Sequence, residues 1–128
     1  MSSQKQLLSD NCGQTCVAML AGVDQWGAMH AVGNDHGTSP GSLHKALEKF
    51  GFVVERKKYT AKELESGKGI ALIRSKSDET YGHAVVYRNG DVEDPAIGMP
   101  MGVDEYVRYI TLADRHVSGL IAITGRRV

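Results

Sequence analysis

The chain has 128 residues, in which 15 lysine and arginine residues balance 15 aspartate and glutamate residues, so its formal net charge at pH 7 is zero. This balance gives no electrostatic basis for binding nucleic acid or an anionic membrane, and we expect neither as a partner. The length favours one domain spanning residues 1–128. No stretch approaches the ~20 apolar residues of a membrane span, and residues 1–8 lack the apolar core of a signal peptide, so we expect a cytoplasmic protein unless a signal-independent route delivers it elsewhere.

Helices are predicted mainly in the first half of the sequence. They cover residues 13–20, 24–32, 40–50, 60–66 and 104–110. The first follows two good capping residues, Asp10 and Asn11, and the third has Ser39 as its cap and Pro40 at its first position. Trp26 in the second helix is expected to pack in the core.

Strands are predicted mainly in the second half. They cover residues 52–56, 69–74, 82–88, 91–94 and 120–124. The dipeptide Asn89-Gly90 between two of them is the strongest short signal for a β-hairpin. Helices followed by mostly antiparallel strands indicate an α+β domain.

Cys12 stands where the first predicted helix begins. The field at the amino end of a helix stabilises negative charge, which favours the nucleophilic thiolate. Cys16 lies one turn further along, outside this field, and is expected to be a small buried hydrophobic residue. The two cysteines could form half of a zinc site, but no second cysteine pair completes it. We therefore expect neither a metal nor another cofactor.

The hairpin supplies a base for Cys12. If Asn89 and Gly90 are the two central turn residues, Asp94 lies opposite Val85 and becomes a diagonal neighbour of His83 on one face. Such neighbours lie ~7–8 Å apart, within reach of an imidazole and a carboxylate. This arrangement is typical of an acid that orients a histidine general base.

An acyl-transfer site also needs hydrogen-bond donors for the oxyanion. The backbone N–H of Cys12 can supply one of them. A glutamine side chain could supply the other, and Gln4, Gln6 and Gln14 are candidates. The two glutamines before the helix are favoured, because Gln14 should point along it, but the residues alone do not choose between them.

The sequence resembles the bacteriocin-processing C39 peptidases, a branch of the papain-like cysteine peptidases. The opening Asp10-Asn11-Cys12-Gly13 followed by an apolar helix is similar to the start of that family, and Gln6 stands six positions before Cys12, at the family's spacing. The blocks Gly82-His83-Ala84-Val85-Val86-Tyr87 and Asp94-Pro95-Ala96 are similar to its later motifs. The resemblance covers residues 6 to about 123.

The resemblance implies a papain-like α+β fold in which the helix bearing the cysteine packs on an antiparallel sheet bearing the histidine and the acid. It assigns Cys12 as the nucleophile, His83 as the base and later the acid, Asp94 as the orienting residue and Gln6 as the oxyanion donor. The expected function is a stand-alone cysteine peptidase that forms a thioester with a peptide or protein substrate.

The sequence leaves the substrate and two alternative functions open. The family's preference for a double glycine makes a Gly-rich cleavage site one expectation for the substrate. The same triad could instead serve an amidase, a deamidase or an acyl transferase, for example in a toxin or effector. A binding module that retains the fold without activity is the third alternative.

Overall fold

The computed structural model describes residues 12–32, 39–78 and 81–126, which form five helices and one six-stranded sheet in this part of the chain. The helices are α1 (Cys12–Ala21), α2 (Gln25–Val32), α3 (Pro40–Lys49), α4 (Ala61–Ser66) and α5 (Val103–Leu112). The strands are β1 (Phe52–Lys57), β2 (Lys68–Ser75), β3 (Gly82–Arg88), β4 (Asp91–Glu93), β5 (Pro100–Gly102) and β6 (Arg115–Arg126). Their order in the sheet is β1-β6-β2-β3-β4-β5, and every pairing is antiparallel. The predicted α+β class is therefore confirmed.

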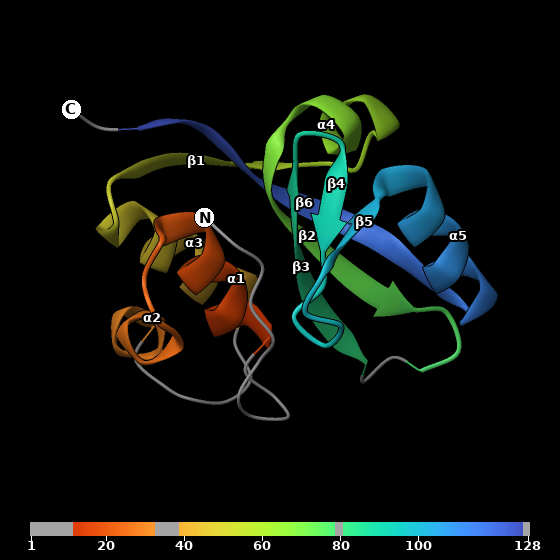
Figure 1. The fold of residues 1–128 in the computed structure, drawn as a ribbon, viewed down its shortest axis with the longest axis horizontal. Helices are drawn as coiled ribbons and strands as arrows, with labels where there is room; N and C mark the ends of the chain where they lie inside the picture. The colour runs from red at the N-terminus through yellow and green to blue at the C-terminus, as the bar shows by residue number, and fades with distance from the viewer. Residues whose placement is uncertain (1–11, 33–38, 79–80, 127–128) are drawn as a thin grey trace.

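The sheet carries apolar side chains on both faces, and each face is covered by helices. Along β3, Ala84 and Val86 pack with α1, α2 and α3, whereas Val85 and Tyr87 pack with α4 and α5. This alternation follows from the two-residue period of a strand, which sends successive side chains to opposite faces. Figure 1 shows α1, α2 and α3 gathered on one side of the sheet and α5 on the other. A strand of this sheet can therefore present residues to either layer.

Local sequence signals explain where the helices begin. The side chain of Ser39 accepts a hydrogen bond from the backbone N–H of Ser42, and Pro40 opens α3. Thr60 caps α4 in the same way through the N–H of Glu63. Each cap satisfies a backbone donor that has no partner within its helix. The predicted cap at Ser39 is confirmed, whereas the capping residues predicted for the first helix, Asp10 and Asn11, lie outside the described residues.

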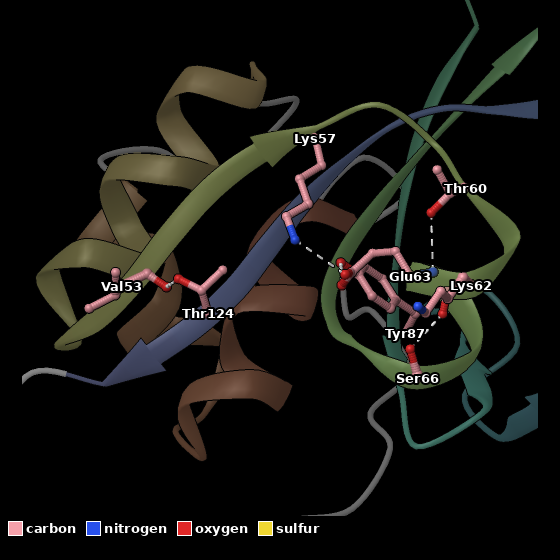
Figure 2. A network of polar contacts seen from close by, with 8 residues as sticks. All are labelled: Val53, Lys57, Thr60, Lys62, Glu63, Ser66, Tyr87 and Thr124. Carbon is pink, nitrogen blue, oxygen red and sulfur yellow. Dashed lines mark hydrogen bonds and ion pairs between the residues drawn. The ribbon is translucent and has the colours of Figure 1, made fainter.

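A polar network ties α4 to the sheet. Glu63 accepts a hydrogen bond of 3.0 Å from the hydroxyl of Tyr87 on β3 and pairs at 3.4 Å with Lys57 of β1 (Figure 2). Tyr87 is completely buried, so its hydroxyl needs this partner. The network joins α4, β1 and the end of β3 that is distant from His83. It therefore supports the fold and is separate from the region around His83.

The structure differs from the prediction at Trp26, whose side chain is 60% exposed. The helix α2 has eight residues and buries Gln25 and Ala28, and Trp26 falls between these positions on the outer side. The prediction that Trp26 packs in the core is therefore wrong.

The structure also contains more strand than was predicted. The strand β5 was missed, because it is too short to give a pattern of its own, and β6 begins five residues before the predicted strand.

At Gly69, the backbone of β2 lies very close to the backbone of β6. Its φ is +154°, and a Cβ atom there would lie 2.1 Å from the carbonyl oxygen of Ile121 on β6. We expect Gly69→Ala to lower the free energy of unfolding by about 3 kcal/mol, because the strands must separate or the backbone must rearrange. Urea denaturation followed by circular dichroism measures this change.

Gly41 provides the matched control. It lies within α3, and a Cβ atom there would come no closer than 3.9 Å to the hydroxyl oxygen of Ser39. Because alanine favours a helix over glycine, Gly41→Ala should leave stability unchanged or raise it by up to about 1 kcal/mol. Equal losses for the two variants would contradict the role assigned to the close approach at Gly69.

Candidate active site

Cys12 is the first residue of α1, where this otherwise buried helix comes to the surface. Every residue from Gly13 to Leu20 is buried, whereas Cys12 is half-buried and its thiol is free of any disulfide. The His83 ring and the backbone N–H groups of Gly13 and Ala84 are near enough to its thiol for each of them to lower the pKa of Cys12. Packing of α1 against β3 therefore brings the thiol to the histidine.

His83 lies near the start of β3. Its Nε2 lies 2.7 Å from Oδ1 of Asp94, so Nδ1 stays available for a hydrogen bond with another group. Burial alone would lower the pKa of His83, but the hydrogen bonds and charges of Asp94 and Cys12 raise it to about 9. Its two neighbours therefore favour the protonated form of the imidazole.

The pKa of the Cys12 thiol is shifted in the opposite direction, downward. Burial alone would raise the pKa of Cys12, but hydrogen bonding and charge from His83, together with the backbone N–H groups of Ala84 and Gly13, bring it below its ordinary value. The pair is thus biased toward a thiolate and an imidazolium. Cys16, by contrast, is fully buried, and burial raises its pKa well above the ordinary value.

Asp94 follows β4 directly and is held by three donors. Besides His83, the backbone N–H of Ala96 donates to Oδ1 at 2.8 Å and the hydroxyl of Tyr106 donates to Oδ2 at 2.7 Å. Burial alone would raise the pKa of Asp94, but these hydrogen bonds and the charge of His83 lower it. Asp94 is therefore an ionised carboxylate whose orientation is fixed.

Tyr106 is the residue of this site that sequence reasoning missed. It lies on the inner face of α5 between the other buried residues Val103 and Ile110, and its side chain is 2% exposed. That spacing marks it as a core residue of an amphipathic helix. Nothing in the pattern indicates that its hydroxyl meets Asp94, because this contact depends on how α5 packs on the sheet.

The predicted hairpin register is confirmed for the pairs from Arg88–Asp91 to Val86–Glu93, whereas the predicted pairing of Asp94 opposite Val85 does not form. Arg88 pairs with Asp91 around the Asn89-Gly90 turn, and Asn89 has a positive φ of 55°, as the turn requires. The ladder ends at Glu93, so Asp94 leaves the strand, and its carboxylate reaches His83 directly. The predicted contact between imidazole and carboxylate is therefore present.

The glutamine candidates for the oxyanion lie in different parts of the chain. Gln14 is fully buried within α1. Gln4 and Gln6 lie outside the described residues. Gln6 therefore stays a prediction.

The described residues contain neither a metal-binding group nor a membrane-spanning helix. Among these residues, no three histidine, cysteine, aspartate or glutamate side chains are grouped so that they could hold a metal ion. None of the helices in the same ranges is long and apolar enough to cross a membrane.

A pocket of about 200 Å³ opens beside the His83–Asp94 contact. It lies on the face of the sheet covered by α5, and its walls include aromatic and aliphatic side chains. Its lining residues are Tyr81, His83, Asp94, Ala96, Ile97, Tyr106, Tyr109, Ile110 and Arg115. The pocket is therefore continuous with the histidine and the carboxylate.

The fold is shared with solved peptidase domains. The peptidase domain of Streptococcus ComA, a bifunctional ABC transporter involved in quorum sensing, superposes with a TM-score of 0.63 at 14% identity, covering 95% of this chain and 97% of that one. A double glycine motif protease from an AMS/PCAT transporter, solved in complex with its leader peptide, superposes with a TM-score of 0.60 at 19% identity, covering 96% and 85%. No family model and no curated protein sequence matches the chain.

These similarities define the class of fold. The chain has the papain-like α+β fold of the C39 bacteriocin-processing peptidase domains, with the cysteine-bearing helix packed on the antiparallel sheet. The resemblance noted in the sequence is therefore confirmed at the level of the fold.

Proposed function

We propose that this protein is a papain-like cysteine peptidase in which Cys12, His83 and Asp94 form the catalytic triad. The observation that carries the proposal is the position of the His83 ring, which contacts the carboxylate of Asp94 at 2.7 Å and is near enough to the thiol of Cys12 to lower its pKa. The opposite pKa shifts of Cys12 and His83 support it, because a working pair needs a thiolate and a protonated imidazole at the same pH.

In the first half of the reaction, the Cys12 thiolate attacks the carbonyl carbon of a peptide bond. A C–S bond forms, and the electron pair of the carbonyl moves to oxygen. His83 then gives its proton to the leaving amide nitrogen as the C–N bond breaks. The amine product departs and a thioester remains on Cys12.

In the second half, water replaces the amine. Neutral His83 takes a proton from the water, whose oxygen attacks the thioester carbonyl, and the C–S bond breaks to release a carboxylic acid. The thiolate and the imidazolium are then restored. Throughout the cycle, Asp94 holds the ring orientation and stabilises its positive charge, and Tyr106 holds Asp94 in place.

Hydrogen-bond donors at the amino end of α1 would stabilise the oxyanion. The backbone N–H of Cys12, in the first turn, has no acceptor within the helix and can donate to the oxyanion. Gln6 is proposed as the second donor from its spacing to Cys12 in the sequence.

A peptide segment is the proposed substrate. One protein of the same fold was solved with a leader peptide bound, which supports a peptide as the ligand of this fold. A Gly-rich cleavage site and a cytoplasmic location remain parts of this proposal.

The proposal is tested by measuring the rate of alkylation by iodoacetamide against pH, with mass spectrometry to locate the modified cysteine. Cys12 should react with an apparent pKa below the ordinary value of ~8.5, because His83 and two backbone N–H groups favour its thiolate. Cys16 is an internal control within the same molecule, and since it is fully buried it should stay unmodified in the folded protein.

A Cys12 that titrates as an ordinary thiol, or reacts no faster than Cys16, would argue against a working triad. It would favour a binding module that keeps the fold without catalysis. If Cys12 is reactive, a second assay separates a peptidase from an enzyme that acts on side-chain amides. A peptidase would cleave peptide bonds as the wild type and lose this activity in Cys12→Ala.

A further inference from the structure

The pocket beside His83 contains a positive charge that the proposed mechanism does not use. Arg115, at the start of β6, is half-buried and lines this pocket. Its guanidinium lies 4.0 Å from the centre of the Tyr81 ring, which fixes the planar group by a cation–π contact. Among the residues that the structure describes, no carboxylate forms an ion pair with Arg115.

The other charges of the pocket cancel one another. Asp94 is the negative group of its lining, and its carboxylate already accepts from His83, Ala96 and Tyr106. The positive charge of the protonated His83 ring offsets the negative charge of the Asp94 carboxylate. The guanidinium of Arg115 therefore gives the pocket a net positive charge, in a partly enclosed space where such a charge attracts an anion more strongly than in open water.

The remaining walls suit a short chain of carbon atoms. Ile97 and Tyr109 contribute apolar surface beside the guanidinium, and the volume of about 200 Å³ is sufficient for one amino-acid side chain. A ligand that fits has an apolar stem and a negatively charged end. Within a peptide, aspartate and glutamate side chains have this form.

We propose that this pocket is a substrate subsite that binds the carboxylate of an acidic residue near the scissile bond, with Arg115 as the specificity-determining residue. The inference rests on the proposed peptidase function and adds a substrate class to it. Since His83 itself lines the pocket, the acidic residue would lie within about three positions of the cleaved bond. The carboxylate at the end of a peptide chain offers the same chemistry, and the experiment distinguishes the two sources.

The experiment uses peptides made by chymotrypsin digestion of a denatured bacterial lysate, incubated with the full chain and sequenced by mass spectrometry. With the wild type, we expect Asp and Glu to be enriched about tenfold over Asn and Gln at one position near the cleaved bond, since a hydrogen bond to a charged group is worth about that factor or more. A terminal carboxylate as the ligand would instead give cleavage at a fixed distance from the peptide end.

Variants of Arg115 test the assignment directly. Arg115→Gln should reduce the enrichment to about one, Arg115→Lys should keep most of it, and Arg115→Glu should replace it with a preference for Lys and Arg. Arg108→Gln is the matched control, because Arg108 is an exposed arginine on α5 that does not line the pocket. Thermal unfolding and the alkylation rate of Cys12 show that each variant is folded and keeps its reactive thiol.

The outcomes separate the two proposals. Cleavage without acidic enrichment, or with enrichment that persists in Arg115→Gln and Arg115→Glu, would overturn the subsite and leave the peptidase standing. An unreactive Cys12, or a complete absence of cleavage, would overturn the peptidase and the subsite with it. Loss of the preference in Arg115→Gln while Arg115→Lys retains it would establish the subsite.

Discussion

Replacing His83 with alanine is expected to lower the rate of peptide hydrolysis about 10⁴-fold. The imidazole is assigned both proton transfers of the cycle, each of which is worth about 10²–10⁴-fold. The same change should raise the apparent pKa of Cys12, because burial, the largest influence on this thiol, then acts without the opposing hydrogen bond and charge of His83. Initial hydrolysis rates and the pH profile of alkylation measure the two effects.

His116→Ala is the control for this variant. His116 is exposed on β6 and lies outside the pocket lining and the triad, so its loss should change neither the rate nor the alkylation profile. If His83→Ala kept an alkylation profile like that of the wild type, the lowered pKa of Cys12 would have to come from the helix end alone. The assignment of His83 as its partner would then be wrong.

The hairpin was predictable in detail because its determinants are local. The turn at Asn89-Gly90 fixes which residues oppose each other, and the two-residue period of a strand then fixes the face of every side chain that follows. Counting along the two strands was therefore enough to predict that His83 and Asp94 are neighbours, which the 2.7 Å contact bears out, although Asp94 lies just beyond the last paired residue of β4.

Contacts between layers were predictable only through the family resemblance. Cys12 and His83 are separated by 71 positions in the sequence, and no local pattern states that α1 packs on β3. The same holds for Tyr106, whose helical spacing predicts a buried ring but is silent on the partner of its hydroxyl. Trp26 was placed wrongly for a related reason: an apolar side chain favours burial, but the face of a short helix is chosen by its packing.

The site therefore combines one locally encoded part with two parts that depend on the fold. The hairpin sets the histidine and its carboxylate, while α1 and α5 bring the thiol and the tyrosine from opposite faces of the sheet. A change that loosens the sheet far from His83 should lower stability while leaving Cys12 reactive in the molecules that remain folded. Gly69, at the opposite end of β2 from the residue paired with His83, offers that comparison.

Asp94 is expected to distinguish orientation from charge in the triad. Asp94→Ala leaves both the Nε2 of His83 and the hydroxyl of Tyr106 without an acceptor, so the ring loses its fixed orientation. We expect hydrolysis to fall about 10²-fold or more, and stability to fall by about 1–3 kcal/mol, the cost of leaving buried donors unpaired. Initial rates and urea denaturation measure these losses.

Asp94→Asn is the matched variant, and its predicted behaviour differs. The amide oxygen can still accept from His83 and from the N–H of Ala96, and the amide nitrogen can donate to the Tyr106 hydroxyl, which also accepts hydrogen bonds. An asparagine serves in this position in the Cys-His-Asn triads of papain-like proteases, so we expect the rate to stay within about tenfold of the wild type. The pKa of His83 should fall from about 9, because burial lowers it and the opposing negative charge is gone.

The pH profile gives the sign of this effect. Activity that requires the imidazolium declines as the pH rises through the pKa of His83, so the alkaline limb of the Asp94→Asn profile should move to lower pH while the variant keeps most of its rate at the optimum. If Asp94→Asn were as inactive as Asp94→Ala, the negative charge itself would be essential to the reaction. If Asp94→Ala were as active as the wild type, Asp94 would have no part in the triad.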